Sequence, residues 1–360
     1  MSGRDRFAPW SVDRPPRLHG VPAIHFVNVK EFVVTVRSAF SLPLVSSVDE
    51  NLELARLGEE LGYDDVWLAD TATIDVFVLA ALVASATSRV RIGTAVVPVF
   101  TRPPALLAAA AASVSQVAGP DRFILGLGSS SPAIVEDWCG IPFERPVTRV
   151  RETVEALRAM FAEPKVSYSG TTTRVKNFRL GVPPAGEVPL WIGAQRPVMA
   201  GVAGEFADGV ACNFIPASAV PTFKETVAVG AARATKTAPL PLVVRLQTIV
   251  TDDRASALET LRAMMGPYLA TPTYNSFLAS CGYEAEAAKI KAGWDNRDRA
   301  GLAAGVTDEL ISDLAIVGDE VECREKVARF VESGVDIPMI HPVVRSKAEA
   351  AAMLEALRPR

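Results

Sequence analysis

Cysteine and long apolar runs are scarce in this sequence, and each scarcity excludes a class of protein. The four cysteines are far apart and never form a Cys-x-x-Cys pair, so we expect neither a zinc site nor a disulfide framework. The most apolar stretches, around residues 76–86 and 104–114, are much shorter than a membrane span, and no apolar core of a signal peptide follows the N-terminal arginines. We therefore expect a cytoplasmic protein with reduced thiols, no metal and no membrane partner.

Charge of one sign is not concentrated anywhere in the chain. Its 360 residues include 37 Lys and Arg against 41 Asp and Glu, a net charge of −4, and no long basic run could follow a nucleic-acid backbone. Nearly half of the residues are apolar and 22% are charged, which is typical of a globular domain with a large core. These numbers indicate a protein that binds a small-molecule substrate and no nucleic acid.

Short apolar runs rich in β-branched residues alternate with longer segments of helical period. This alternation is typical of βα units that build a parallel sheet. Eight such runs are present: Phe32–Phe40, Asp65–Ala69, Val90–Val97, Phe123–Leu127, Leu190–Gly193, Gly209–Asn213, Leu242–Val250 and Ile337–Ile340. Eight parallel strands can close a barrel, so we predict an α/β fold with a single TIM (βα)8 barrel over residues 32–360, after an N-terminal extension of residues 1–31.

Three connections are longer than the usual few residues and are therefore predicted insertions with a functional role. The first, residues 129–145, follows the fourth strand. The second, residues 165–188, precedes the fifth strand and has the pattern of a small hairpin. The third, residues 252–312, lies between the seventh and eighth strands and contains helical pieces. All three could reach the open end of the barrel.

Two neighbouring predicted helices, about residues 75–87 and 104–117, are apolar nearly all round. Each must be covered by other structure. The barrel and its neighbouring helices could bury them, but two such helices exceed what one outer ring usually hides. We therefore expect a homodimer.

A strand, a tight turn and a helix start follow one another at Gly193-Ala194-Gln195-Arg196-Pro197. Backbone N–H groups of Gly193 to Arg196 are expected to point out of the helix N-terminus, where the helix dipole also favours negative charge. Proline suits the first helical position because the N–H there has no partner. The sequence thus predicts a phosphate site.

Three further motifs lie on the predicted strands. They are Leu61–Asp70, Arg91–Val96 and Asp121–Gly128, which read LGYDDVWLAD, RIGTAV and DRFILGLG. Together with the stretch at Gly193 they resemble the bacterial luciferase-like monooxygenase superfamily over about residues 32–344. The resemblance implies a TIM barrel that uses either FMN or the deazaflavin coenzyme F420.

The residues around the phosphate site look like the F420 branch, which includes methylenetetrahydromethanopterin reductase. This resemblance is carried by Ala194–Pro197 and by Gly204–Gly209, which reads GEFADG. It implies that Gly193, Ala194, Gln195, Arg196 and Asn213 contact the coenzyme phosphate. The FMN-binding branch places an arginine just after the fourth strand, and here that position is Ser129. FMN stays the alternative cofactor, because Arg196, Arg245 or Arg345 could neutralise the phosphate of either one.

The resemblance also implies how the cofactor ring is held. Family members have a non-prolyl cis peptide at the end of the third strand, and the matching bond is Ala95–Val96. The small or hydroxyl residues after the fourth strand, Gly128, Ser129 and Ser130, would contact the ring or tail. The alternatives are that Ala95 and Val96 are ordinary barrel-core residues, and that Ser129 and Ser130 belong to a serine-rich turn without a cofactor contact.

Few groups remain for proton transfer, because Thr71 stands where F420-dependent sugar phosphate and alcohol dehydrogenases have a histidine. Asp70 and His341 are the candidate catalytic residues. The alternatives are that Asp70 caps a turn and that His341 is a hydrogen-bonded structural residue. The function we expect is F420-dependent hydride transfer to or from a small organic substrate. The alternatives are a two-component FMN-dependent monooxygenase that uses O2, and a barrel that binds a cofactor without turnover.

Overall fold

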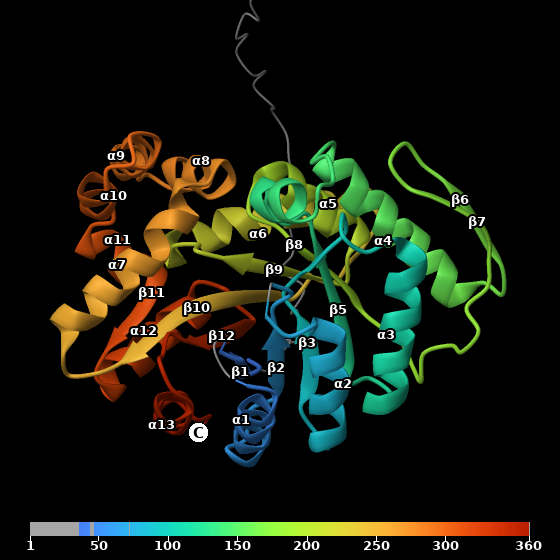
Figure 1. The fold of residues 1–360 in the computed structure, drawn as a ribbon, viewed down its shortest axis with the longest axis horizontal. Helices are drawn as coiled ribbons and strands as arrows, with labels where there is room; N and C mark the ends of the chain where they lie inside the picture. The colour runs from blue at the N-terminus through green and yellow to red at the C-terminus, as the bar shows by residue number, and fades with distance from the viewer. Residues whose placement is uncertain (1–35, 44–46, 72, 360) are drawn as a thin grey trace, which may run out of the picture. The chain divides into compact units, whose positions relative to one another are not determined.

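The computed structural model describes residues 36–43, 47–71 and 73–359. The predicted extension, residues 1–31, and the start of the first predicted strand lie outside these ranges. The described residues form a closed barrel of parallel strands in which the last strand pairs with the first (Figure 1). The barrel strands are, in order, β1 Ala39–Ser41, β2 Asp65–Leu68, β3 Arg91–Thr94, β5 Phe123–Gly128, β8 Leu190–Gly193, β9 Gly209–Asn213, β10 Leu242–Val250 and β12 Ile337–Pro342. The predicted TIM barrel is confirmed.

Helices surround the strands. The helices that follow barrel strands are α1 Val48–Glu60, α2 Val76–Ala86, α3 Pro104–Ala118, α4 Pro146–Ala162, α5 Pro197–Phe206, α6 Val220–Arg233, preceded by the 3-10 turn Ala217–Ala219, and α13 Lys347–Ala356. Local sequence sets their ends. Ser47 caps α1 together with Glu50 in a reciprocal capping box, and proline occupies the first turn of α3, α4, α5 and α6.

Large aromatic side chains fill the interior of the barrel. Trp67 and Trp191 lie with ring centroids 5.3 Å apart, and a Cβ on Gly93 or Gly209 would collide with one of these rings. Those two glycines therefore provide the space that the tryptophans occupy. The rest of this inner layer is aliphatic: Ala39, Ile124, Ala211, Val243, Ile337 and Met339. The barrel is a packed core, as expected for this fold.

The strands differ from the predicted ones in two places. The predicted run Val90–Val97 is divided into β3 and the two-residue strand β4 Val97–Pro98, because the Ala95–Val96 peptide bond is cis and turns the chain. A further strand, β11 Ala315–Gly318, pairs with the last residues of β10 and was not predicted. It begins directly after a helix, so no turn residues mark its start in the sequence. Helix α12 Glu320–Glu332 then leads to β12.

Additional structure occupies the three long connections. A π-helix, Ala133–Trp138, follows β5. The predicted hairpin is confirmed as the antiparallel pair β6 Val166–Ser169 and β7 Arg174–Phe178, whose turn donates three backbone N–H groups to the buried carboxylate of Glu152 on α4. Between β10 and β11 are five helices with a hydrophobic core of their own (Figure 1): α7 Arg254–Ala270, α8 Pro272–Ser280, α9 Glu284–Asp295, α10 Arg299–Gly305 and α11 Asp308–Leu314.

Membrane-spanning helices were searched for in the described ranges. No helix there combines the length and the apolar composition needed to cross a bilayer.

Candidate functional site at the carboxyl ends of the barrel strands

The inward-facing residues at the carboxyl ends of the strands differ on the two sides of the barrel. Side chains alternate along a strand, so the layers above the aliphatic interior come from residues two or four positions further on. On β2, β3, β5 and β8 these residues are small: Ala69, Ala95, Gly128 and Gly193. On β1, β9, β10 and β12 they are polar: Ser41, Asn213, Arg245, Gln247 and His341. The open end therefore has a small-residue side and a polar side.

Val96 is the largest side chain on the small-residue side. The predicted cis bond between Ala95 and Val96 is present. A Cβ on Gly128 would lie 2.4 Å from Cγ2 of Val96, and a Cβ on Gly193 would lie 2.9 Å from its Cγ1. Both glycines are therefore needed for Val96 to lie between β5 and β8, where it presents an apolar surface toward the barrel mouth.

The two serines after β5 lie next to this surface. Ser129 donates from its hydroxyl to the carbonyl of Ser130 at 3.3 Å, and Ser130 has a positive φ of 63°. Both are half-buried. They end the strand in a tight bend at the barrel mouth.

The predicted anion site is an exposed helix start, with one correction. Arg196 is the N-cap of α5, Pro197 is in its first turn, and no side chain caps this end. Ala194, however, donates its N–H to the carbonyl of Ala211 at 2.9 Å, because β8 continues pairing with β9 for one residue more than predicted. The prediction that the Ala194 N–H faces a phosphate is therefore wrong, and among the described residues the N–H groups of Gln195 and Arg196 have no backbone partner.

Gln195 is a buried residue with an unused donor. Its Oε1 accepts from the backbone N–H of Asn213 at 3.4 Å and from the thiol of Cys212 at 3.5 Å. Its Nε2 is buried and has no hydrogen-bond partner in the described part of the chain. An amide group held by one end, with the donor end unused, is suited to bind an acceptor that enters from outside.

Asn213 connects the barrel to the helical insertion. Its Oδ1 accepts from Nε2 of Gln247 at 3.1 Å, and its Nδ2 lies 3.5 Å from the hydroxyl of Tyr274 on α8. Tyr274, Tyr268 on α7 and Phe214 pack as an aromatic cluster with centroid distances of 5.4 to 6.5 Å. Burial raises the pKa of Tyr274 to about 12, although the Asn213 contact lowers it, so the phenol stays protonated.

His341 is buried between an arginine and a serine. Nη2 of Arg245 lies 2.6 Å from its Nε2, and Oγ of Ser41 lies 2.6 Å from its Nδ1. A guanidinium can only donate, so a ring nitrogen of His341 accepts from Arg245, whose Nη2 also lies 3.1 Å from Nδ1. Burial and the positive charge of Arg245 hold the pKa of His341 well below its usual value. His341 is thus a neutral, hydrogen-bonded histidine in this structure.

Asp70 lies in a different group of charges, just after β2. Nε and Nη2 of Arg102 lie 3.2 and 3.5 Å from its two carboxylate oxygens, and Nη2 of Arg102 also donates to Asp75 at 2.7 Å. Asp75 is the N-cap of α2. Burial raises the pKa of Asp70, while Arg102 opposes this rise. Burial thus makes the Asp70 carboxyl a weaker acid than an exposed aspartate, which is the direction of change that a proton-transfer group requires.

Ser41 and Arg102 lie at strand ends, where a TIM barrel places its functional groups, but the sequence did not indicate their partners His341 and Asp70. Gln247 was not predicted, although strand alternation could have found it, because it continues the inward-facing series of Val243. No group of three or more metal-ligating side chains is placed to hold a metal within the described ranges.

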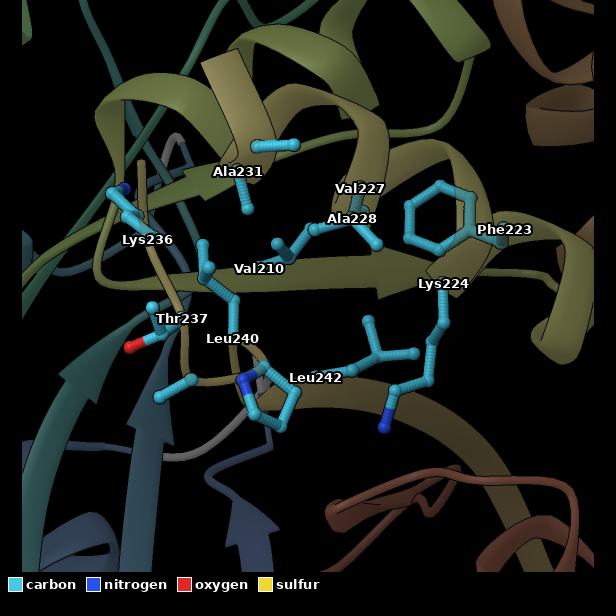
Figure 2. Close-up of a pocket in the computed structure, with 13 residues that line it drawn as sticks. Val210, Phe223, Lys224, Val227, Ala228, Ala231, Lys236, Thr237, Leu240 and Leu242 are labelled. Atoms are coloured by element: carbon cyan, nitrogen blue, oxygen red, sulfur yellow. The ribbon is translucent and has the colours of Figure 1, made fainter. Parts of the chain in front are cut away.

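A separate cavity of about 240 Å³ lies at the opposite ends of the strands, beneath α6 (Figure 2). Its lining includes Val210, Val227, Leu240 and Leu242, and the two lysines at its edge donate to backbone carbonyls. In this fold the chemistry takes place at the carboxyl ends, so we do not assign the active site to this cavity.

Comparison with known proteins identifies the family of this chain. The family model described as "Luciferase-like monooxygenase" matches residues 30–337. A putative coenzyme F420-dependent oxidoreductase of Mycobacterium tuberculosis is 28% identical over 85% of this chain and 93% of its own length. An F420-dependent glucose-6-phosphate dehydrogenase of Rhodococcus erythropolis is 32% identical over 81% and 87%. The structure of the coenzyme F420-dependent tetrahydromethanopterin reductase of Methanopyrus kandleri is similar in fold, with a TM-score of 0.76, 21% identity and coverage of 90% and 98%.

Proposed function

Because this chain belongs to the luciferase-like monooxygenase family, we propose that it is an F420-dependent oxidoreductase that transfers hydride to or from a small organic substrate. Its relatives by sequence are F420-dependent oxidoreductases, which favours the deazaflavin over FMN. The proposal goes beyond these names to the residues of this chain.

One observation carries the proposal. The buried Nε2 of Gln195, for which no described residue is a hydrogen-bond partner, and the uncapped start of α5 lie beside the cradle that Val96, Gly128 and Gly193 form. A planar ring needs an apolar surface with no projecting side chains, and a phosphate needs unused N–H donors. The two requirements are met side by side, so the residues present fit this cofactor.

Each residue has a defined task in this proposal. Val96 supports the ring from one side, and Ser129 and Ser130 border it. Gln195 and the N–H groups of the α5 start, with the exposed guanidinium of Arg196, hold the phosphate. Asn213 orients Gln195 through its backbone N–H and holds Tyr274 in place.

When bound, the deazaflavin supplies the hydride donor or acceptor. The protein orients the substrate, excludes water and moves a proton. Asp70 is the group we assign to proton transfer, because burial raises its pKa and Arg102 fixes its orientation. His341 is neutral and positions Arg245 through its Nε2.

The test is a fluorescence titration of the purified protein with F420 and, separately, with FMN. We expect F420 to bind and R196Q to weaken it by about tenfold, with a smaller salt dependence, since one phosphate contact is lost. Turnover is then measured with a secondary alcohol and with glucose 6-phosphate, the substrate classes named for relatives.

The same titration separates the alternatives. Tight binding of FMN without F420 binding, together with O2 consumption by the reduced flavin, would establish the monooxygenase instead. F420 binding without turnover of any substrate tested would favour a barrel that holds a cofactor and does not react. Either result contradicts the proposal.

We also propose a homodimer formed through α2 and α3, which lie side by side (Figure 1). Four apolar side chains on these helices are exposed in the single chain: Val78 (55%), Leu82 (37%), Leu106 (64%) and Val117 (47%). Light scattering should give a dimer for the wild type and a monomer for L106E. The matched control is V321E on α12, since Val321 is also 64% exposed.

A cytoplasmic location without a nucleic-acid partner completes the proposal. All four cysteines are free, including the exposed Cys139, as a reducing compartment allows, and acidic groups outnumber basic ones. Cell fractionation and a mobility-shift assay with duplex DNA test these two points. Recovery in a membrane fraction, or a salt-sensitive shift, would contradict them.

A further inference from the structure

Arg245 lies at the barrel mouth without a negative partner. It projects inward from β10, in the layer above Val243. No carboxylate in the described part of the chain forms a salt bridge with it, and the nearby groups that carry acidic protons are two tyrosines, Tyr268 and Tyr274. Its Nη2 donates to His341, and its Nε is buried without any hydrogen-bond partner.

An unpaired cation in this position is costly to the folded protein. Burial lowers the pKa of the guanidinium, yet an arginine side chain does not lose its proton in proteins. Taking a charge out of water without an opposite charge costs free energy, as breaking a buried ion pair does. Such groups occur where a ligand supplies the missing charge.

The surroundings of Arg245 orient it rather than neutralise it. His341 accepts from one arm of the guanidinium and is itself fixed by Ser41. Asn213, its neighbour across the β9–β10 ladder, has its side chain held by Gln247 and Tyr274. The unused Nε is thus held in place before a ligand arrives, which reduces the entropy cost of binding.

We propose that Arg245 binds an anionic oxygen group of the substrate, a carboxylate or a phosphate. This inference rests on the proposed function, because it assigns a substrate to the same barrel mouth. The cofactor phosphate is the other possible source of the anion. It is assigned to the α5 start at β8, and β9 separates β8 from β10, so the two donor sets are about 10 Å apart at the usual strand spacing of about 4.8 Å.

The experiment measures binding of benzoate, benzamide and inorganic phosphate by calorimetry, in the protein with and without F420. Benzoate and benzamide have the same shape and differ in charge. We expect benzoate or phosphate to bind the wild type at least about tenfold more tightly than benzamide, and R245Q to lose that difference. R245K keeps the positive charge but loses the planar set of donors of the guanidinium. It should therefore retain part of the preference for benzoate or phosphate over benzamide. R174Q, on the exposed hairpin, is the control for lost net charge.

Two outcomes overturn the inference. If neither anion binds, or if R245Q binds them as the wild type does, Arg245 has no such role. If F420 displaces the anion competitively, Arg245 binds an anionic group of the cofactor and not of the substrate. F420 binding measured by fluorescence tests the proposed function separately, so a protein that binds F420 but not the anions would contradict this inference alone.

The melting temperature of the free protein gives a second readout. Removing an unpaired buried charge should leave R245Q at least as stable as the wild type, and benzoate should raise the melting temperature of the wild type only. A large loss of stability in R245Q would show that Arg245 is already satisfied by the fold, and would also overturn the inference.

Discussion

Gly128 and Val96 are in such close contact that no side chain fits between them: a Cβ on Gly128 would lie 2.4 Å from Cγ2 of the valine. Real Cβ atoms do not approach other atoms so closely, so either Val96 or the end of β5 must move in a variant. The apolar surface of the barrel mouth therefore depends on a glycine whose φ is ordinary.

We predict that G128A lowers the affinity for F420 by about tenfold or more and destabilises the fold by about 1–3 kcal/mol, as overpacking does. Fluorescence titration and urea denaturation measure the two effects. G181A is the control, because nothing lies within 4 Å of a Cβ at Gly181, an exposed position. Equal F420 affinity in G128A and the wild type would show that Val96 does not contact the ring.

A second prediction concerns Asp70. If it transfers the proton, D70N should lower kcat by about 10²-fold or more with a modest change in Tm. R102Q removes the positive charge that opposes the rise in the pKa of Asp70, so the inflection that Asp70 causes in the pH–rate profile should move to higher pH.

Asp75 provides the matched control for Asp70. It shares Arg102 but caps α2, accepting from the N–H groups of Phe77 and Val78. D75N keeps a capping oxygen and loses only the charge that pairs with Arg102, so it should reduce stability by less than about 1 kcal/mol without a comparable fall in kcat. If D70N behaves in the same way as D75N, Asp70 is a turn residue, as the alternative interpretation of the sequence has it.

Much of the barrel could be predicted from the sequence because its signals are local and repeated. The alternation of apolar runs and helical segments gave the eight barrel strands, and the Ser47–Glu50 pair gave a helix start that the structure confirms. β11 was not predicted, since Ala315–Gly318 directly follows the last helix of the insertion and no turn residues mark its start.

The site was harder to predict because its contacts join distant segments. No sequence pattern pairs Ser41 with His341, which are 300 positions apart, or Asp70 with Arg102. Sequence alone also could not show that the Ala194 N–H is used in the sheet, which depends on where β8 stops pairing with β9. Which side chains contact one another across a barrel depends on the tertiary structure, and the local pattern of a single sequence does not reveal it.

A third prediction follows from the neutral state of His341. Its pKa in the folded protein is far below the value of about 6.5 for an unfolded chain, so only the unfolded chain gains a proton near pH 6. The stability linked to this residue is fully present above pH 6.5 and is lost as the pH falls below it. Each pH unit below 6.5 should cost up to about 1.4 kcal/mol.

The comparison of the wild type with H341Q tests this. Glutamine keeps an acceptor for Arg245 and does not titrate, so its unfolding free energy should fall less between pH 7 and pH 5. Urea unfolding at half-unit steps gives the two curves. Parallel curves would mean that His341 is not held neutral by its surroundings.

The last prediction concerns Glu59, which joins the end of α1 to the segment before β3. Its carboxylate accepts from the backbone N–H groups of Ser88, Arg89 and Val90 at 2.6 to 3.1 Å. Burial raises its pKa, but these hydrogen bonds outweigh burial and lower the pKa to about 2. The stabilisation is therefore present above about pH 4.5, and is lost as the pH falls from 4.5 toward 2. This range lies below the one set by His341.

We expect E59Q to lower the unfolding free energy by about 1–2 kcal/mol at pH 7, a value reduced for the partial exposure of the group. The difference from the wild type should shrink toward zero as the pH approaches 2, because a protonated carboxyl accepts hydrogen bonds from the three N–H groups less strongly than a carboxylate does. E60Q, at the exposed neighbouring position, is the control and should change stability little at any pH. A difference between E59Q and the wild type that stays constant from pH 7 to pH 3 would show that shape, and not charge, makes Glu59 stabilising.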